Sequence, residues 1–163
     1  MAIRNACKAI ILDDGKILLN RCENSIGDAC YGLSRGGVYY DFPGGGQNQY
    51  ETLEEAVRRE CLEETGYMVK VERLAGIFEE ISMNERFRAK YPDYAHKVFF
   101  VFICRLAGEP LAEPSDKDLD MVAPEWVKVG DAKNAAIMPP AIGRNLETLI
   151  ETDTPLFLGS VRV

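Results

Sequence analysis

The chain has 163 residues, of which 47% are hydrophobic and 28% charged, a balance typical of a soluble globular protein and not of a disordered or membrane-spanning one. This length suits one ordinary domain, so we expect a single domain over residues 1–163. A formal net charge of −7 disfavours nonspecific binding to nucleic acid, and no apolar run approaches the roughly 18 residues of a membrane span. Five cysteines without a CxxC pair indicate reduced core residues, and we expect a cytoplasmic protein.

The first predicted element is a β-hairpin. Apolar runs at 6–12 and 16–20 are joined by an Asp-Asp-Gly sequence, and an Asp-Gly pair between such runs favours a tight turn. Residues 38–42 have the composition of a strand and lead into a glycine-rich loop at 43–46.

Further elements follow to the end of the chain. We expect, in order, a helix at 53–64, extended chain at 68–81, a strand at 97–106 that is the most buried segment, a short strand at 126–128, a helix from 139–140 to about 150, and a last strand within 155–163. Strands and helices are thus interspersed, which favours a mixed sheet flanked by helices.

The helix at 53–64 is marked at both ends. Thr52 and Glu55 have the spacing of a capping box, in which the hydroxyl and the carboxylate each accept a backbone N–H of the first turn. Gly66, just past the last turn, can take the left-handed conformation that ends a helix.

A helical wheel of this segment shows an interrupted apolar stripe. The stripe comprises Leu53, Ala56, Val57 and Cys61. Glu60 and Glu64 fall close to its centre, and Glu63 lies at its edge. Carboxylates so placed repel one another, and burying them costs several kcal/mol more unless each charge is paired. A divalent cation would remove both costs, and clustered hard oxygen ligands suit Mg²⁺ or Mn²⁺. A solvated, charge-rich helix face is the competing interpretation.

The loop before the helix favours the metal interpretation. From Gly45 to Tyr67 the sequence resembles the Nudix box, G-x5-E-x7-R-E-U-x-E-E-x-G-U, where U is a bulky apolar residue. The glycine, glutamate and arginine positions all match, at Gly45, Glu51, Arg59, Glu60, Glu63, Glu64 and Gly66. Cys61 and Tyr67 are less usual at their apolar positions. The resemblance implies an α/β (α+β) fold, an α/β/α sandwich with a mixed β-sheet.

The same resemblance implies a metal-dependent pyrophosphohydrolase. Glu60, Glu63 and Glu64 would hold one to three Mg²⁺ or Mn²⁺ ions together with the backbone carbonyl of Gly45. Metal bound across the phosphates would neutralise developing charge and lower the pKa of an attacking water. The expected substrate is a small phosphorylated molecule: a nucleoside diphosphate joined to another moiety, as in a nucleotide sugar or ADP-ribose, or a nucleoside triphosphate. A homodimer is left open.

Further roles are assigned by the resemblance with less specificity. Glu51 would pair with Arg59 and brace the loop against the helix. In this family the general base is either a box glutamate or an acidic residue on a distant loop, for which Asp118 and Asp120 are candidates beside Asp116. That this acidic run is only solvated surface is equally open.

Candidates for binding the substrate come from the residues near the glycine loop. Arginines suit bidentate contacts with phosphate, aromatic rings suit stacking on a base, and glycines allow close approach of the main chain. The candidates are Arg21, Arg35 and Arg4 for phosphate, Phe42 with Tyr39 and Tyr40 for a base, and Gly44 and Gly45 in the loop. His96, the only histidine, could also reach the site, although a histidine at a strand end is more often incidental.

Three alternatives use the same fold. A binding module that senses a nucleotide without cleaving it is the main one, but such modules commonly lose box carboxylates that this chain keeps. A diphosphate isomerase would need a cysteine-centred acid site that is not identified. RNA decapping is disfavoured by the acidic balance.

Overall fold

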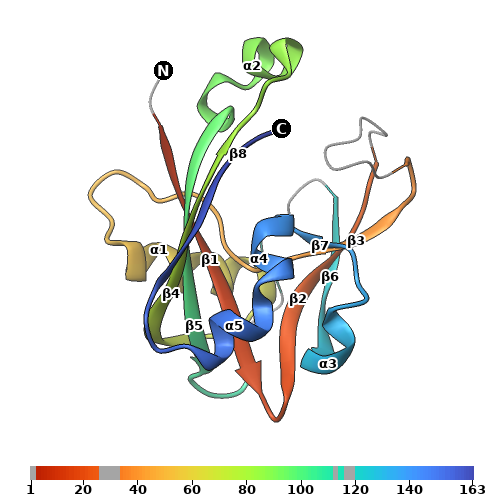
Figure 1. The fold of residues 1–163 in the computed structure, drawn as a ribbon. Coiled ribbons are helices and arrows are strands. Elements are labelled where there is room, and N and C mark those ends of the chain that lie inside the picture. The colour runs from red at the N-terminus through yellow and green to blue at the C-terminus, as the bar shows by residue number, and fades with distance from the viewer. Residues whose placement is uncertain (1–2, 26–33, 112–113, 116–119) are drawn as a thin grey trace.

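The computed structural model describes residues 3–25, 34–111, 114, 115 and 120–163, and within them eight strands form one sheet (Figure 1). The strands are β1 (Arg4–Asp13), β2 (Lys16–Glu23), β3 (Val38–Asp41), β4 (Val69–Ile81), β5 (His96–Leu106), β6 (Met121–Lys128), β7 (Ile137–Met138) and β8 (Leu156–Arg162). Their order is β7-β3-β2-β1-β5-β4-β8, with β6 paired to β2. The helices are α1 (Leu53–Thr65), α2 (Glu85–Lys90), η2 (Pro92–Tyr94), α3 (Val129–Ala132), α4 (Pro140–Arg144) and α5 (Leu146–Glu151).

The sheet is mixed, as the sequence predicts. Strands β1 and β5, β3 and β7, and β4 and β8 pair in parallel, while the β1–β2, β2–β3, β2–β6 and β4–β5 pairs are antiparallel. The β1–β2 hairpin is confirmed, with Asp14 and Gly15 both at positive φ, as a type I′ turn requires. The expectation that 97–106 is the most buried segment is wrong. β1 is buried at seven consecutive positions, whereas β5 begins with three half-buried residues.

The sheet divides beside β1. The pairing of β1 with β2 is confined to Ile11–Asp13 of β1 and Lys16–Leu18 of β2. Beyond Leu18, β2 diverges from β1. The glycine loop takes the vacated edge, because the Cys7 amide donates to the Gly45 carbonyl and the Ala9 amide donates to the Pro43 carbonyl, each at 2.8 Å. The loop that follows β3 is therefore fixed between the two halves of the sheet.

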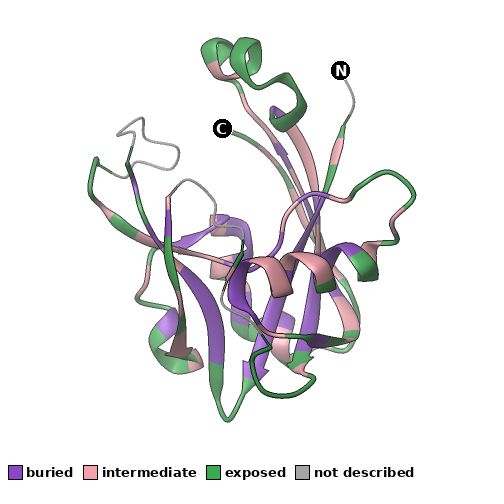
Figure 2. Cartoon of the chain, turned by 180° about the vertical axis from the view of Figure 1, so that it is seen from behind, coloured by how far each residue is buried: buried purple, intermediate pink, exposed green. Residues whose placement is uncertain are grey.

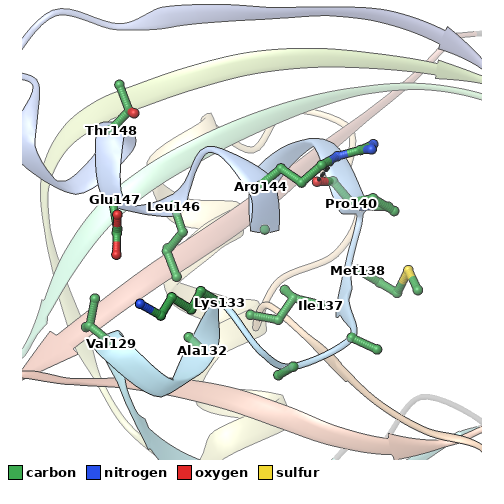
Figure 3. Close-up of a pocket in the computed structure, with 13 residues that line it drawn as sticks. Val129, Ala132, Lys133, Ile137, Met138, Pro140, Arg144, Leu146, Glu147 and Thr148 are labelled. Carbon is green, nitrogen blue, oxygen red and sulfur yellow. Dashed lines mark hydrogen bonds between the residues drawn. The ribbon is translucent and has the colours of Figure 1, made fainter.

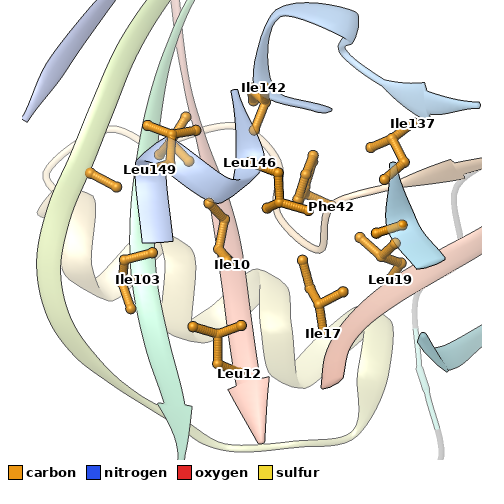
Figure 4. Close-up of a cluster of buried hydrophobic side chains, with 13 residues drawn as sticks. Ile10, Leu12, Ile17, Leu19, Phe42, Ile103, Ile137, Ile142, Leu146 and Leu149 are labelled. Atoms are coloured by element: carbon orange, nitrogen blue, oxygen red, sulfur yellow. The ribbon is translucent and has the colours of Figure 1, made fainter. Parts of the chain in front are cut away.

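Helices cover both faces of the sheet. Alternate residues of β1 pack to opposite sides: Ile11 belongs to the cluster under α1, with Val57 and Cys61. Figure 2 shows buried residues gathered in the central strands of the sheet. Ile10 belongs to a second cluster with Leu146 and Leu149 of α5, drawn in Figure 4. Helix α1, which carries the Nudix box, and the C-terminal helix α5 thus lie on opposite faces of the sheet, consistent with the expected sandwich.

The C-terminal half departs from the prediction in detail. The single helix expected from 139–140 to about 150 is divided into α4 and α5 at Asn145, whose backbone leaves the helical region while its side-chain amide donates to the Ala141 carbonyl. The strand expected at 126–128 begins earlier, at Met121, and the last strand is present as β8. The short elements α2, η2, α3 and β7 were not predicted.

The cysteines and the helices bear on two further expectations. Cys7, Cys22, Cys61 and Cys104 are buried free thiols, and Cys30 lies outside the described residues. In the described part of the chain no helix is long and apolar enough to cross a membrane.

Candidate active site

Helix α1 has the predicted caps. The Thr52 hydroxyl accepts the Glu55 amide at 3.2 Å, and the Glu55 carboxylate accepts the Thr52 amide at 2.8 Å, so both bonds of the capping box form. At the other end Gly66 has φ 76° and donates its amide to the Leu62 carbonyl. These caps set the register in which the helix presents its glutamates to the sheet.

Glu64 is directed into the protein. Its residue is only 5% exposed, as expected from its place on the apolar stripe. One carboxylate oxygen accepts the side-chain amide of Asn20 at 2.8 Å and the backbone amide of Gly44 at 2.9 Å. Helix, β2 and glycine loop therefore meet at this single oxygen atom.

Arg59 connects the helix to the loop. Its guanidinium binds both carboxylate oxygens of Glu51, at 2.8 and 3.0 Å, and donates to the Gly46 carbonyl at 2.9 Å. It also binds Glu60 at 2.8 Å and Glu63 at 3.0 Å. The hydrogen bonds from Arg59 lower the pKa of Glu51, and those to Glu51 raise the pKa of Arg59. The pair keeps both charges and holds the loop against the helix.

Glu60 lies against the loop at Gly45. A Cβ at Gly45 would be 2.6 Å from a Glu60 carboxylate oxygen, so any larger side chain would displace that carboxylate. The Glu60 charge is close enough to act on the buried Cys7 thiol: burial first, then the charges of Glu60 and Glu51, raise the pKa of Cys7 to about 12. Glycine at position 45 is what lets the carboxylate and the main chain come together.

Sequence reasoning missed a buried lysine on the other side of the loop. Lys8 is 6% exposed and donates to the Asp41 carboxylate and the Phe42 carbonyl, each at 2.9 Å. These bonds fix the start of the glycine loop to β1. A signal was present, since Lys8 is the one charge in the apolar run at 6–12.

The residues around Glu64 suit a hard divalent cation. The Asn20 side-chain oxygen is buried and has no hydrogen-bond partner among the described residues. An orphaned oxygen beside a buried carboxylate favours a bound cation or its water. Within the described ranges, no three His, Cys, Asp or Glu side chains are grouped so as to hold a metal. Mg²⁺ commonly uses one or two carboxylates, with waters and substrate phosphates completing its shell. The Glu60 and Glu64 carboxylates meet that requirement.

The candidates for the general base outside the box have other partners or fall outside the described residues. Asp120 accepts from the Ser25 amide at 3.1 Å, the Ser25 hydroxyl and the Tyr39 hydroxyl, also at 3.1 Å, and thus connects the start of β6 to β2 and β3. No hydrogen bond between described residues joins it to a box glutamate. Asp116 and Asp118 lie outside the described residues.

The candidates for substrate binding differ in their exposure and in their partners. The Phe42 ring is fully buried in the cluster under α5, so it packs in the core and is not available for stacking on a base. Arg21 pairs with Glu23, and strand alternation directs it to the face opposite Asn20. Arg35 is exposed before β3, and His96 binds Glu79 at 2.8 Å.

A separate cavity of about 490 Å³ lies between α3, β7, α4 and α5 (Figure 3). Ala132, Ile137 and Leu146 form part of its wall, and Lys133 and Arg144 also line it. Since α5 covers the face of the sheet opposite α1, this cavity is distinct from the glutamate cluster.

The mixed sheet, the glycine loop and the helix-borne carboxylates together form the arrangement that the resemblance to the Nudix box implies. A sequence model of the NUDIX domain matches residues 3–148, and the chain belongs to this family. A curated protein named ADP-ribose pyrophosphatase, from Methanocaldococcus jannaschii, is 34% identical over 111 residues. That match covers 68% of this chain but only 56% of the relative.

Solved structures support the same fold. A NUDIX hydrolase from Nitrosomonas europaea has a TM-score of 0.67 at 20% identity, covering all of this chain and 81% of its own. An ADP-ribose pyrophosphatase from Streptococcus suis has a TM-score of 0.58 at 20% identity, covering 96% and 99%. A MutT protein from Bacillus halodurans has a TM-score of 0.61 at 19% identity, covering 98% and 90%.

Proposed function

We propose that this chain is a metal-dependent pyrophosphohydrolase that cleaves the phosphoanhydride bond of a nucleoside diphosphate derivative. The observation that carries the proposal is the buried Glu64 carboxylate, which meets the Gly44 amide and the Asn20 side chain while Glu60 lies over Gly45. A carboxylate buried beside the glycine loop, as Glu64 is, contributes nothing to apolar packing and costs stability unless it is paired. The relative named ADP-ribose pyrophosphatase supports a substrate of that kind.

Glu60, Glu64 and the Gly45 carbonyl would hold Mg²⁺ or Mn²⁺, with Glu63 as a further ligand. The bound cation would supply charge neutralisation on the phosphates and acidify a coordinated water. The Gly45 carbonyl already accepts the Cys7 amide, and its second lone pair is the one available for a metal. Arg59 would hold the Glu60 carboxylate and the loop in fixed relation, and the glycines would let a pyrophosphate approach the main chain.

For the general base we propose a glutamate of the Nudix box in preference to Asp120. Glu63 has the most exposed carboxylate side chain bound to Arg59, at 34%, and so can reach water. Asp120 is already an acceptor for Ser25 and Tyr39. Asp118 is retained as a second candidate from the same acidic run.

The test is a turnover screen with metal. ADP-ribose, nucleotide sugars and nucleoside triphosphates are incubated with the protein in Mg²⁺ or Mn²⁺, and products are separated by chromatography. We expect hydrolysis of a diphosphate derivative to two phosphate esters, with turnover lost in EDTA and restored by excess cation. Full turnover in EDTA would contradict the metal mechanism.

A nucleotide-sensing module of the same fold is the second candidate. It predicts that a nucleotide derivative binds but emerges unchanged from the screen. The retained glutamates at 60, 63 and 64 favour the enzyme, because a sensing module has no need of like charges clustered on one side of a helix.

A further inference from the structure

The Arg4 side chain lies beside the glycine loop. Arg4 begins β1 and is half-buried, with its guanidinium 4.6 Å from the centre of the Tyr94 ring. On another side it contacts Gly46, where any Cβ would collide with the guanidinium. Ring and glycine together hold the group in one orientation, and a stacked guanidinium loses less freedom when it binds a ligand.

Within the described part of the chain this guanidinium has no acidic partner. Among the described residues no carboxylate lies within 4.0 Å of Arg4, whereas Arg59, Arg73 and Arg105 each have one. In a chain with a net charge of −7, an ordered arginine without a carboxylate is a local site for an anion. The geometry of a guanidinium matches a phosphate through two parallel hydrogen bonds.

Arg4 is also close to the proposed catalytic residues. Arg4 lies against Gly46 at its Cβ position, the Gly46 carbonyl accepts from Arg59, and the preceding Gly45 lies against Glu60. The loop thus passes between Arg4 and the box helix. A diphosphate lying along the loop would have the carboxylate cluster at one phosphate and Arg4 near the other.

We propose that Arg4, oriented by Tyr94 and Gly46, is a substrate-binding residue that receives the phosphate attached to the nucleoside, while the carboxylate cluster lies at the other phosphate of the diphosphate derivative. This inference rests on the proposed function, since it places the substrate at the same loop. Tyr94 comes from η2, between β4 and β5, so this segment contributes to recognition. Tyr94 is 49% exposed, and its ring lies against the guanidinium from the outer side.

The first experiment separates binding from turnover. Arg4→Gln should raise KM for a hydrolysed diphosphate about 10- to 100-fold, the range expected when a charge-assisted hydrogen bond is lost. The value of kcat should change by less than about 3-fold, because uniform binding is removed. Arg58→Gln is the matched control, since Arg58 is exposed and pairs with Glu54 on the outer side of α1. Equal KM values for the two variants would overturn the proposal.

A second experiment does not need turnover. Calorimetry with the metal-free protein measures binding of AMP and of adenosine, which lacks the phosphate. Arg4→Gln should weaken AMP binding at least about 10-fold relative to the parent and leave adenosine binding unchanged. Tyr94→Leu should weaken AMP binding several-fold, and Tyr94→Phe less than Tyr94→Leu, because the phenyl ring keeps the cation–π contact.

The two experiments also separate two kinds of failure. If the parent hydrolyses nothing but binds AMP through Arg4, the proposed function is wrong and this binding site stands. If hydrolysis is normal and AMP binding is the same in parent and Arg4→Gln, the proposed function stands and the inference about Arg4 is wrong. Melting temperatures of all variants check that each protein is folded.

Discussion

The helices on the two faces of the sheet bury different kinds of residue. On one face α5 buries Leu146 and Leu149 and exposes Glu147 and Thr148, which is a regular amphipathic helix. On the other face α1 buries Val57 and Cys61, and with them the charged Glu64. One helix is therefore explained entirely by packing, and the other is not.

This contrast locates the chemistry. Burying a carboxylate costs more than burying a leucine unless it is hydrogen-bonded, and the Glu64 carboxylate accepts hydrogen bonds from the Asn20 side chain and the Gly44 amide. Such an arrangement trades stability for a positioned charge. Variants on the two faces should therefore fail in different ways, one in activity and the other in folding.

The largest expected effect is on catalysis. Glu64→Gln keeps the volume of the side chain and an oxygen that can accept the Asn20 and Gly44 amides, but removes the charge. Turnover should fall by more than about 100-fold. That loss is larger than the one expected when a residue that only hydrogen-bonds to a metal ligand is replaced. The metal-free melting temperature should stay within about 4 °C of the parent, or rise, because repulsion from Glu60 is relieved.

Thermal unfolding with and without Mg²⁺ completes this test. Excess Mg²⁺ should stabilise the parent by an amount set by its affinity and concentration, and Glu64→Gln by clearly less. Strong destabilisation of the metal-free variant with near-normal hydrolysis would mean that Glu64 is a structural residue and that the active site lies elsewhere.

On the opposite face the effect should be on folding. Leu149 is fully buried among Ile10 and Leu146, and Leu149→Ala should reduce the free energy of unfolding by about 2–5 kcal/mol. Denaturant titration measures this loss. The KM and kcat of the remaining folded protein should match the parent at a temperature well below the transition. A change in kcat without loss of stability would break the distinction between the faces.

The smallest effect should come from replacing Glu51, which is expected to contribute both to activity and to stability. Arg59 lowers the pKa of Glu51 from its ordinary 4.5, so the pair contributes stability that is complete above pH 4.5 and is lost as pH falls toward the lowered value. Glu51→Gln should therefore be less stable than the parent at pH 7, with the difference shrinking below pH 4.5. Its turnover should fall less than that of Glu64→Gln. A stability difference independent of pH would exclude the ion pair as its cause.

The elements that the sequence predicted well are those with local signals. The positive φ of Gly15, the Thr52–Glu55 capping box and the left-handed Gly66 each depend on residues within one turn. The placement of Glu64 followed from helical periodicity alone. Its buried state is confirmed, while its catalytic role, like that of the other box residues, stays a prediction.

The features that were missed depend on distant partners. Lys8 meets Asp41 across 33 residues, and Asn20 meets Glu64 across 44, separations over which no sequence pattern predicts contact. The division of the last helix was missed because the Asn145 side chain competes for a backbone carbonyl, an effect that periodicity does not report. The sequence leaves open whether Phe42 packs in the core or contacts substrate, and in the structure its side chain is fully buried.

The glycine loop has a second consequence for β1. A strand whose partner diverges leaves unpaired N–H groups, and such an edge can pair with another chain and aggregate. Here the loop covers the amides of Cys7 and Ala9 with its own carbonyls at Gly45 and Pro43. The segment proposed to receive the pyrophosphate therefore also closes an otherwise adhesive strand edge, so changes in its length would be constrained by solubility as well as by catalysis.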